Sequence, residues 1–193
     1  ADIDQMLYDM DEDYMQAAQS GDTETAQQMV NERANAMGYT EEMFHGTREK
    51  FTSFDVDRSG FGTSGYGIYL GDRTIAGVYS DDNPIRLYIN PDRLATKESH
   101  HITADMVREA LNNLHLAEDK ILKDMGVDSL EEYISIRNND WKVAYDIQDW
   151  SQWPVWYGDS SSTGKMSPSE VLSIIQKATG LDGMRNQNET VLW

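Results

Sequence analysis

The segment 43–80 constrains the fold most strongly, because it predicts two short apolar strands on either side of a polar, glycine-rich excursion. The first strand ends in His45-Gly46-Thr47, which brings an imidazole, a bare backbone and a hydroxyl to one point. Because Gly46 has no side chain, a planar ligand can lie against the main chain there and bond its N–H and C=O groups. This strand end is therefore a candidate binding site.

The second strand is expected over 67–70, and Asp72 is the expected N-cap of the helix that follows it. Tyr69 and Tyr79 lie ten residues apart across this strand-to-helix turn, so both rings can flank a flat ring bound between them. The glycine-rich stretch 58–65 has two interpretations: a lip over a ligand, or an ordinary long hairpin loop.

The end of the chain predicts a helix and a final strand. Ser167, followed by a proline and by a glutamate three residues on, is a typical helix start, and Gly180 is a typical helix stop. The apolar strand expected over 189–193 opens with Glu189. From the strand pattern alone, Glu189 is interpreted as an exposed carboxylate at a strand end.

The remaining sequence is mostly helical in its patterning. Residues 1–40 predict a helical hairpin packed on a core domain over 41–193, and that domain carries a helical, tryptophan-rich insertion at about 95–165. Within the insertion, 103–124 predicts one long amphipathic helix. The aromatic stretch 150–157 either covers the core or forms a contact surface.

Composition narrows the classes of partner. The chain has 34 acidic and 16 basic residues, a formal charge of −18, which disfavours a nucleic-acid backbone or an anionic membrane as partner. No apolar run reaches transmembrane length, and there are no cysteines for disulfides or thiolate chemistry. His100, His101 and His115 lack metal-ligand spacing, so no metal site is expected.

Four segments taken together resemble the ADP-ribosyltransferases of the poly(ADP-ribose) polymerase and diphtheria-toxin type. They are His-Gly-Thr at 45–47, Gly-Tyr-Gly-Ile-Tyr at 65–69, Ala-Gly-Val-Tyr at 76–79, and a late strand that opens with Glu189. The resemblance implies an α+β fold with a split mixed β-sheet core, to which the N-terminal hairpin and the helical insertion are added. A similar helical lead-in precedes this domain in many phage and polymorphic-toxin proteins.

The resemblance also assigns roles in binding NAD+, which such enzymes use as a substrate without a metal. His45 would bond the 2′-hydroxyl of the adenosine-side ribose. Gly46 would hold the nicotinamide amide through its backbone, and Thr47 could add a hydroxyl bond. Tyr69 and Tyr79 would stack on the nicotinamide ring.

In the same family the late glutamate is catalytic, which assigns that role to Glu189. Its carboxylate would bond the 2′-hydroxyl of the nicotinamide-side ribose, stabilise the developing cation and orient the acceptor. Ala76 departs from the pattern, since many relatives have a serine there that bonds the nicotinamide amide. Gln187 stands two residues before Glu189 and is a candidate acceptor contact.

These assignments predict a mono-ADP-ribosyltransferase that transfers ADP-ribose from NAD+ to a macromolecule, with a protein as the expected acceptor. A toxin or phage effector is expected, acting in the cytoplasm of a target or host bacterial cell as part of a larger delivered polypeptide. An immunity protein would be a natural partner of such a toxin. Two alternatives stay open: an NAD+ glycohydrolase that uses the same residues, and an inactive NAD-binding or protein-interaction module.

Overall fold

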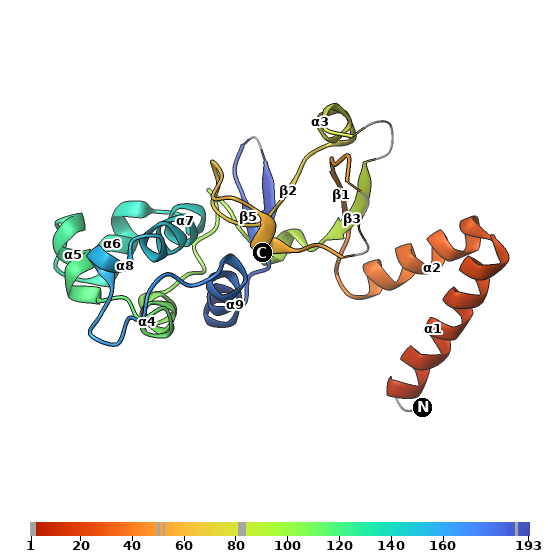
Figure 1. Ribbon diagram of the computed structural model, residues 1–193. Helices are drawn as coiled ribbons and strands as arrows, with labels where there is room; N and C mark the ends of the chain where they lie inside the picture. Colours follow the sequence, from red (N-terminus) through yellow and green to blue (C-terminus); the bar gives the residue numbers. More distant parts are fainter. Residues whose placement is uncertain (1–2, 50, 52, 81–83, 188) are drawn as a thin grey trace. The chain divides into compact units, whose positions relative to one another are not determined.

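The computed structural model describes residues 3–49, 51, 53–80, 84–187 and 189–193. It has a mixed α+β architecture with small sheets, which confirms the α+β class, whereas the ADP-ribosyltransferase core stays a prediction (Figure 1). The chain divides into two compact units. The first comprises Ala1–Glu42 and Tyr88–Pro91, and the second comprises Met43–Leu87 and Asp92–Trp193.

The first unit contains two helices, α1 (Ile3–Ser20) and α2 (Thr23–Ala36), at the positions that the sequence predicts. Asp22 caps α2 by accepting a hydrogen bond from the backbone N–H of Thr25 at 3.1 Å. The guanidinium of Arg33 pairs with Asp11 across the hairpin. The predicted packing of this hairpin on the core domain stays a prediction.

The second unit is built on a four-stranded mixed sheet with the order β2-β6-β5-β4. The pairs β2–β6 and β5–β6 are antiparallel, whereas β4–β5 is parallel. β4 and β5 were not expected from the sequence, because each is only two or three residues long. The strands are β2 (Ile68–Leu70), β6 (Thr190–Leu192), β5 (Gly183–Arg185) and β4 (Leu94–Ala95).

A separate two-stranded sheet pairs β1 (Glu41–His45), where the sequence predicts a strand, with β3 (Ile85–Ile89). A single antiparallel bridge connects β1 to the main sheet, since Phe44 and Gly71 exchange two backbone hydrogen bonds of 2.9 Å. The strand that carries His45 therefore lies beside the end of β2.

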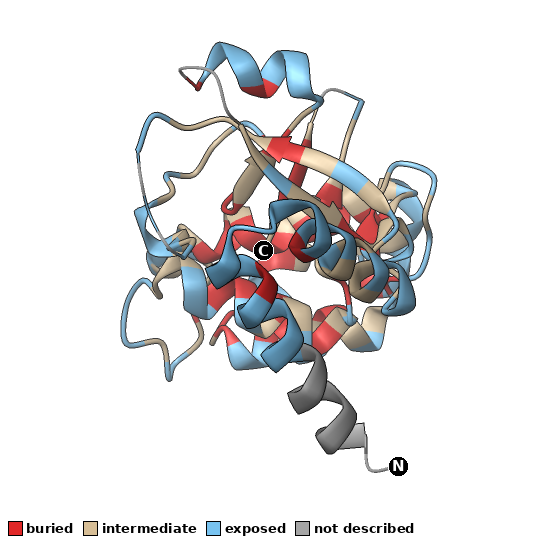
Figure 2. Ribbon diagram, turned by 90° about the vertical axis from the view of Figure 1, so that its right-hand side faces the viewer, coloured by how far each residue is buried: buried red, intermediate tan, exposed pale blue. Residues whose placement is uncertain are grey.

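The helices of the second unit bury their apolar faces in one core (Figure 2). Helices α4, α7 and α9 contact one another, and α7 also contacts strands β4 and β5 (Figure 1). Fully buried aliphatic side chains such as Val107, Ile147 and Ile175 fill the interior. The helices are α3 (Arg73–Val78), α4 (Ala104–Asn113), α5 (Glu118–Met125), α6 (Leu130–Arg137), α7 (Asp140–Ser151), α8 (Pro154–Tyr157) and α9 (Pro168–Thr179). No described helix has both the length and the apolar character needed to cross a membrane.

The prediction of one helix over 103–124 is wrong. The structure ends α4 at Asn113 and starts α5 at Glu118, and His115 between them has a positive φ of 55°. Leu116 then forms a β-bridge with Gly158. The break lets both helices bury their apolar faces against the same core, which a straight helix would not do.

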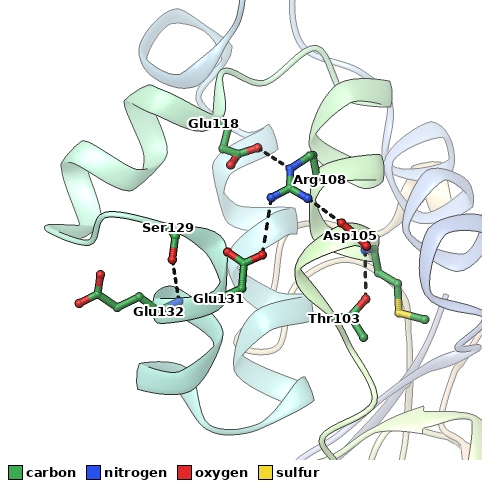
Figure 3. Close-up of polar contacts among 8 residues, drawn as sticks. Thr103, Asp105, Arg108, Glu118, Ser129, Glu131 and Glu132 are labelled. Atoms are coloured by element: carbon green, nitrogen blue, oxygen red, sulfur yellow. Dashed lines mark hydrogen bonds and ion pairs between the residues drawn. The ribbon is translucent and has the colours of Figure 1, made fainter.

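An ion-pair cluster connects the three helices around this break (Figure 3). The guanidinium of Arg108 in α4 lies 2.7 Å from Asp105, 3.2 Å from Glu118 in α5 and 3.9 Å from Glu131 in α6. Ser129 caps α6 and accepts a hydrogen bond from the backbone N–H of Glu132 (Figure 3). Because the cluster is partly exposed, its contribution to stability is modest.

The aromatic stretch 150–157 combines both of the roles considered for it. Trp150 is buried in the core, where its ring centroid lies 5.3 Å from that of Tyr133. Trp153 and Trp156, by contrast, are exposed on either side of the start of α8. One tryptophan therefore stabilises the core, and two are available for contacts.

Candidate functional site

The end of strand β2 organises the candidate site, because the predicted residues flank it. The bridge between Phe44 and Gly71 places β1, and with it His45, on one side of β2. On the other side, β6 pairs with β2 and begins at Thr190, the partner of the last residue of β2. Glu189 directly precedes that residue, so His45 and Glu189 stand at the same end of β2 on its two sides.

His45 is half-buried and anchored to β2. Its Nδ1 lies 2.9 Å from the carbonyl oxygen of Tyr69. A carbonyl oxygen can only accept a hydrogen bond, so Nδ1 must carry the proton, and Nε2 of the neutral ring is then an acceptor. The ring also packs edge-on against Phe54, with centroids 5.2 Å apart. His45 is thereby oriented to accept a hydrogen bond from a ligand hydroxyl.

Gly46 lies directly against helix α3. A Cβ atom at this position would come within 2.2 Å of the carbonyl oxygen of Ala76 and 2.8 Å of the Cβ of Tyr79. Close packing is therefore sufficient to require glycine here, independently of any ligand. The neighbouring hydroxyl of Thr47 accepts a hydrogen bond from the backbone N–H of Glu49 at 3.0 Å, which fixes its position.

The two tyrosines have different environments. The Tyr69 hydroxyl donates to the carbonyl oxygen of Gly65 at 2.7 Å and accepts from the backbone N–H of Ser64 at 3.2 Å. Its ring therefore contacts the glycine-rich stretch and is held in place. Tyr79, the C-cap residue of α3, is 65% exposed. Of the two tyrosines, Tyr69 is the one whose hydroxyl makes described hydrogen bonds that fix its ring.

The carboxylate of Glu189 is held by two hydroxyls from the glycine-rich stretch. Ser64 donates to Oε1 at 2.5 Å, and Thr63 donates to the same oxygen at 2.9 Å. Asn186 completes the network: its Oδ1 accepts from the backbone N–H of Glu189 at 3.0 Å, and its Nδ2 donates to the Ser64 hydroxyl at 2.8 Å. Since both hydroxyls bond Oε1, Oε2 accepts from neither of them.

Electrostatics also connect Glu189 to Tyr69. Burial raises the pKa of the Tyr69 phenol above its ordinary value, and the N–H of Ser64 opposes this rise. The negative charge of Glu189 adds to the increase in pKa, because it disfavours a second negative charge nearby. Tyr69 therefore stays neutral, and its ring lies within the field of the carboxylate.

Ser64 is a candidate site residue that sequence reasoning missed. It is buried, at the centre of a tight turn in which Gly62 and Gly65 exchange hydrogen bonds of 3.0 and 3.1 Å. Gly65 has a φ of +85°, a conformation that favours glycine. The glycine-rich composition indicates a turn, but no local signal places its hydroxyls beside a glutamate far along the chain.

A buried glutamine from the helical insertion supports this turn. The Oε1 of Gln148 in α7 accepts a hydrogen bond from the backbone N–H of Tyr66 at 2.8 Å. A Cβ atom on Gly65 would lie only 2.4 Å from the same oxygen. The insertion therefore helps to position the turn that holds Glu189.

A cavity of about 390 Å³ opens beside His45, within the size range of small-molecule sites. Its described lining residues are His45, Thr47, Glu49, Phe51, Ser53, Phe54, Asp55, Val56, Arg58, Ser59, Gly67 and Ile68. Tyr69, Tyr79 and Glu189 are not among the described residues that line it. The described lining of the cavity thus includes two predicted ligand contacts, His45 and Thr47, but neither of the tyrosines that are predicted to stack on nicotinamide.

One side of this cavity is fixed by a contact between distant segments. Asp57, in the short helix η1 (Val56–Arg58), accepts hydrogen bonds from the backbone N–H and the hydroxyl of Ser169 at 2.7 and 2.9 Å. These bonds hold the pKa of the Asp57 carboxyl below its ordinary value, because they stabilise the charged form. The cavity wall is thereby attached to the first turn of α9.

The remaining predicted residue, Gln187, is exposed two positions before Glu189. Over the described part of the chain, no group of three or more His, Cys, Asp or Glu residues could hold a metal ion.

Comparisons with protein-family models, with curated proteins and with solved structures found no match. The functional conclusion therefore depends on the site itself.

Proposed function

We propose that this chain is an NAD+-dependent mono-ADP-ribosyltransferase that cleaves the nicotinamide–ribose bond and transfers ADP-ribose to a protein. The observation that carries the proposal is the position of Glu189, held by Ser64 and Thr63 at the end of β2, across that strand from His45. A carboxylate fixed in this way can stabilise positive charge that develops on a ribose. A toxin or effector role is part of the proposal.

In the proposed reaction the bond between the ribose C1′ and the nicotinamide nitrogen breaks. Its electron pair stays on the nicotinamide, which leaves as a neutral molecule, and the ribose acquires oxocarbenium character. Glu189 stabilises this cation and accepts a hydrogen bond from the ribose 2′-hydroxyl through Oε2, the oxygen that neither Ser64 nor Thr63 bonds. A nucleophile of the acceptor then bonds C1′ and gives up its proton to water.

The cavity beside His45 suits the adenosine half of NAD+. Nε2 of His45 is an acceptor in the tautomer that the Tyr69 carbonyl selects, so it can accept a hydrogen bond from a ribose hydroxyl. Phe51 and Phe54 offer apolar ring surface to a base, and Arg58 offers a positive charge to a phosphate. Tyr69 and Tyr79 are assigned to the nicotinamide half.

The test follows the fate of NAD+ labelled on its adenosine side. The wild type, Glu189→Gln and the control Glu109→Gln, which changes an exposed glutamate of α4, are incubated with bacterial lysate. We expect the wild type and Glu109→Gln to release nicotinamide and to label a protein, and Glu189→Gln to do neither. Label recovered only as free ADP-ribose would replace the proposal with an NAD+ glycohydrolase. No release by any of the three would leave a binding module.

A further inference from the structure

Three apolar residues close together in the sequence, at and just before α8, have exposed side chains. Trp153 is 53% exposed, Val155 90% and Trp156 72%. Large aromatic residues in the open are unfavourable for an isolated protein, and they are enriched at protein–protein interfaces. We call the surface formed by Trp153, Val155 and Trp156 the tryptophan surface.

The backbone beneath this surface is held rigidly. The carbonyl oxygen of Tyr157 accepts from the backbone N–H of Ala117 at 2.6 Å, and that of Pro154 accepts from the N–H of Gly158 at 2.9 Å. The Tyr157 hydroxyl donates to Asp124 of α5 at 2.8 Å, and α8 lies against α5 (Figure 1). The two indoles are therefore presented on a fixed turn, which lowers the entropy lost when a partner binds.

Carboxylates lie close to Tyr157 at the end of α8. The hydrogen bond to Asp124, together with burial and the nearby charges of Asp124 and Asp149, raises the pKa of Tyr157 to about 12. Asp159 lies two residues beyond Tyr157. Lys120 also reaches this segment, where its ammonium donates to the carbonyl oxygen of Gly158 at 2.6 Å. A segment that exposes two indoles and has the carboxylates of Asp124 and Asp149 near its Tyr157 matches a cationic partner, since arginine and lysine stack on aromatic faces and are attracted to carboxylates.

We propose that the tryptophan surface docks a positively charged segment of a partner protein, with arginine or lysine side chains over the faces of Trp153 and Trp156. The idea that this partner is also the acceptor of ADP-ribose rests on the proposed function, whereas the binding of the partner does not. The formal charge of −18 supports such a partner by attracting it over a distance.

The binding test uses the full chain and a fluorescent oligo-arginine peptide as the probe. The double variant Trp153→Ala/Trp156→Ala is compared with the wild type, with Trp153→Phe/Trp156→Phe, and with Ile136→Ala, which removes a 63% exposed apolar side chain from α6. All four have the same charge, so non-specific attraction is equal among them. We expect the double alanine variant to bind roughly tenfold more weakly, the phenylalanine variant to retain most of the affinity, and Ile136→Ala to match the wild type.

Equal affinity of the wild type and the double alanine variant would overturn the proposal. So would a wild type that dimerises through this surface, seen in sedimentation as a dimer that only the double alanine variant loses. In the labelled NAD+ assay, we expect the double variant to release nicotinamide at the wild-type rate and to label protein less. If the double alanine variant loses peptide binding but the wild type never releases nicotinamide, the proposed function is refuted and the docking proposal still holds.

Discussion

Ser64→Ala tests whether the network around Glu189 is built to hold its carboxylate. The substitution removes a buried hydroxyl that donates to Glu189 at 2.5 Å and accepts from Asn186 at 2.8 Å. A hydrogen bond to a charged group contributes about 1.5–3 kcal/mol and a neutral one about 0.5–1.5 kcal/mol. Because Glu189 is partly exposed and keeps its bond to Thr63, we expect a net loss of about 1–2 kcal/mol in the free energy of unfolding.

The matched control is Thr63→Val, which removes an exposed hydroxyl bonded to the same carboxylate oxygen. Water can replace that bond, so we expect a change within about 0.5 kcal/mol. Urea unfolding measures both variants, and nicotinamide release at saturating NAD+ measures the effect on the site. We expect release to fall by about tenfold or more in Ser64→Ala, since a displaced catalytic group costs up to about 100-fold. Equal effects of the two substitutions on stability and release would refute this reasoning.

Two further predictions concern the walls of the site. Gly46→Ala should destabilise the protein by about 1–3 kcal/mol in urea unfolding, because its Cβ would lie 2.2 Å from the carbonyl oxygen of Ala76. Gly77→Ala, whose Cβ would meet no atom within 4 Å outside its own helix backbone, should leave stability unchanged or raise it in the same assay. The pKa of Asp57 is lowered in the folded state, so the stability it contributes is present above its unfolded pKa of about 4 and is lost as pH falls through the lower folded value. Urea titrations below pH 4 should therefore show a larger acid-dependent loss of stability in the wild type than in Asp57→Asn, which keeps the loss due to the other carboxyl groups. Equal pH profiles would contradict the role given to the bonds from Ser169.

The parts of the fold that the sequence predicted best depend on contacts within four residues. Asp72, Ser129 and Ser167 each accept a hydrogen bond from a backbone N–H three residues later, as their N-cap patterns indicate. The helix stop at Gly180 is equally local, since only the αL conformation of that residue is required. Short-range chemistry of this kind can be recognised without knowing the rest of the chain.

What the sequence did not reveal depends on distant partners. The break at His115 is favoured by the bridge between Leu116 and Gly158, and the parallel pairing of β4 with β5 joins strands almost ninety residues apart. The bond from Ser64 to Glu189 spans 125 residues. Glycine-rich composition indicated a turn near Ser64, but only the folded chain brings that hydroxyl to the carboxylate.

The most direct test of the central claim is nicotinamide release from saturating NAD+ by the wild type and by Glu189→Gln, with the affinity of each for NAD+ measured separately by calorimetry. The two side chains have nearly the same shape, so the substitution removes the negative charge and leaves the surrounding contacts largely in place. The account predicts that turnover falls at least about 100-fold while affinity stays within a few-fold, because the charge acts on the transition state. Equal turnover by both proteins, or loss of affinity together with loss of folding, would contradict a catalytic role for Glu189.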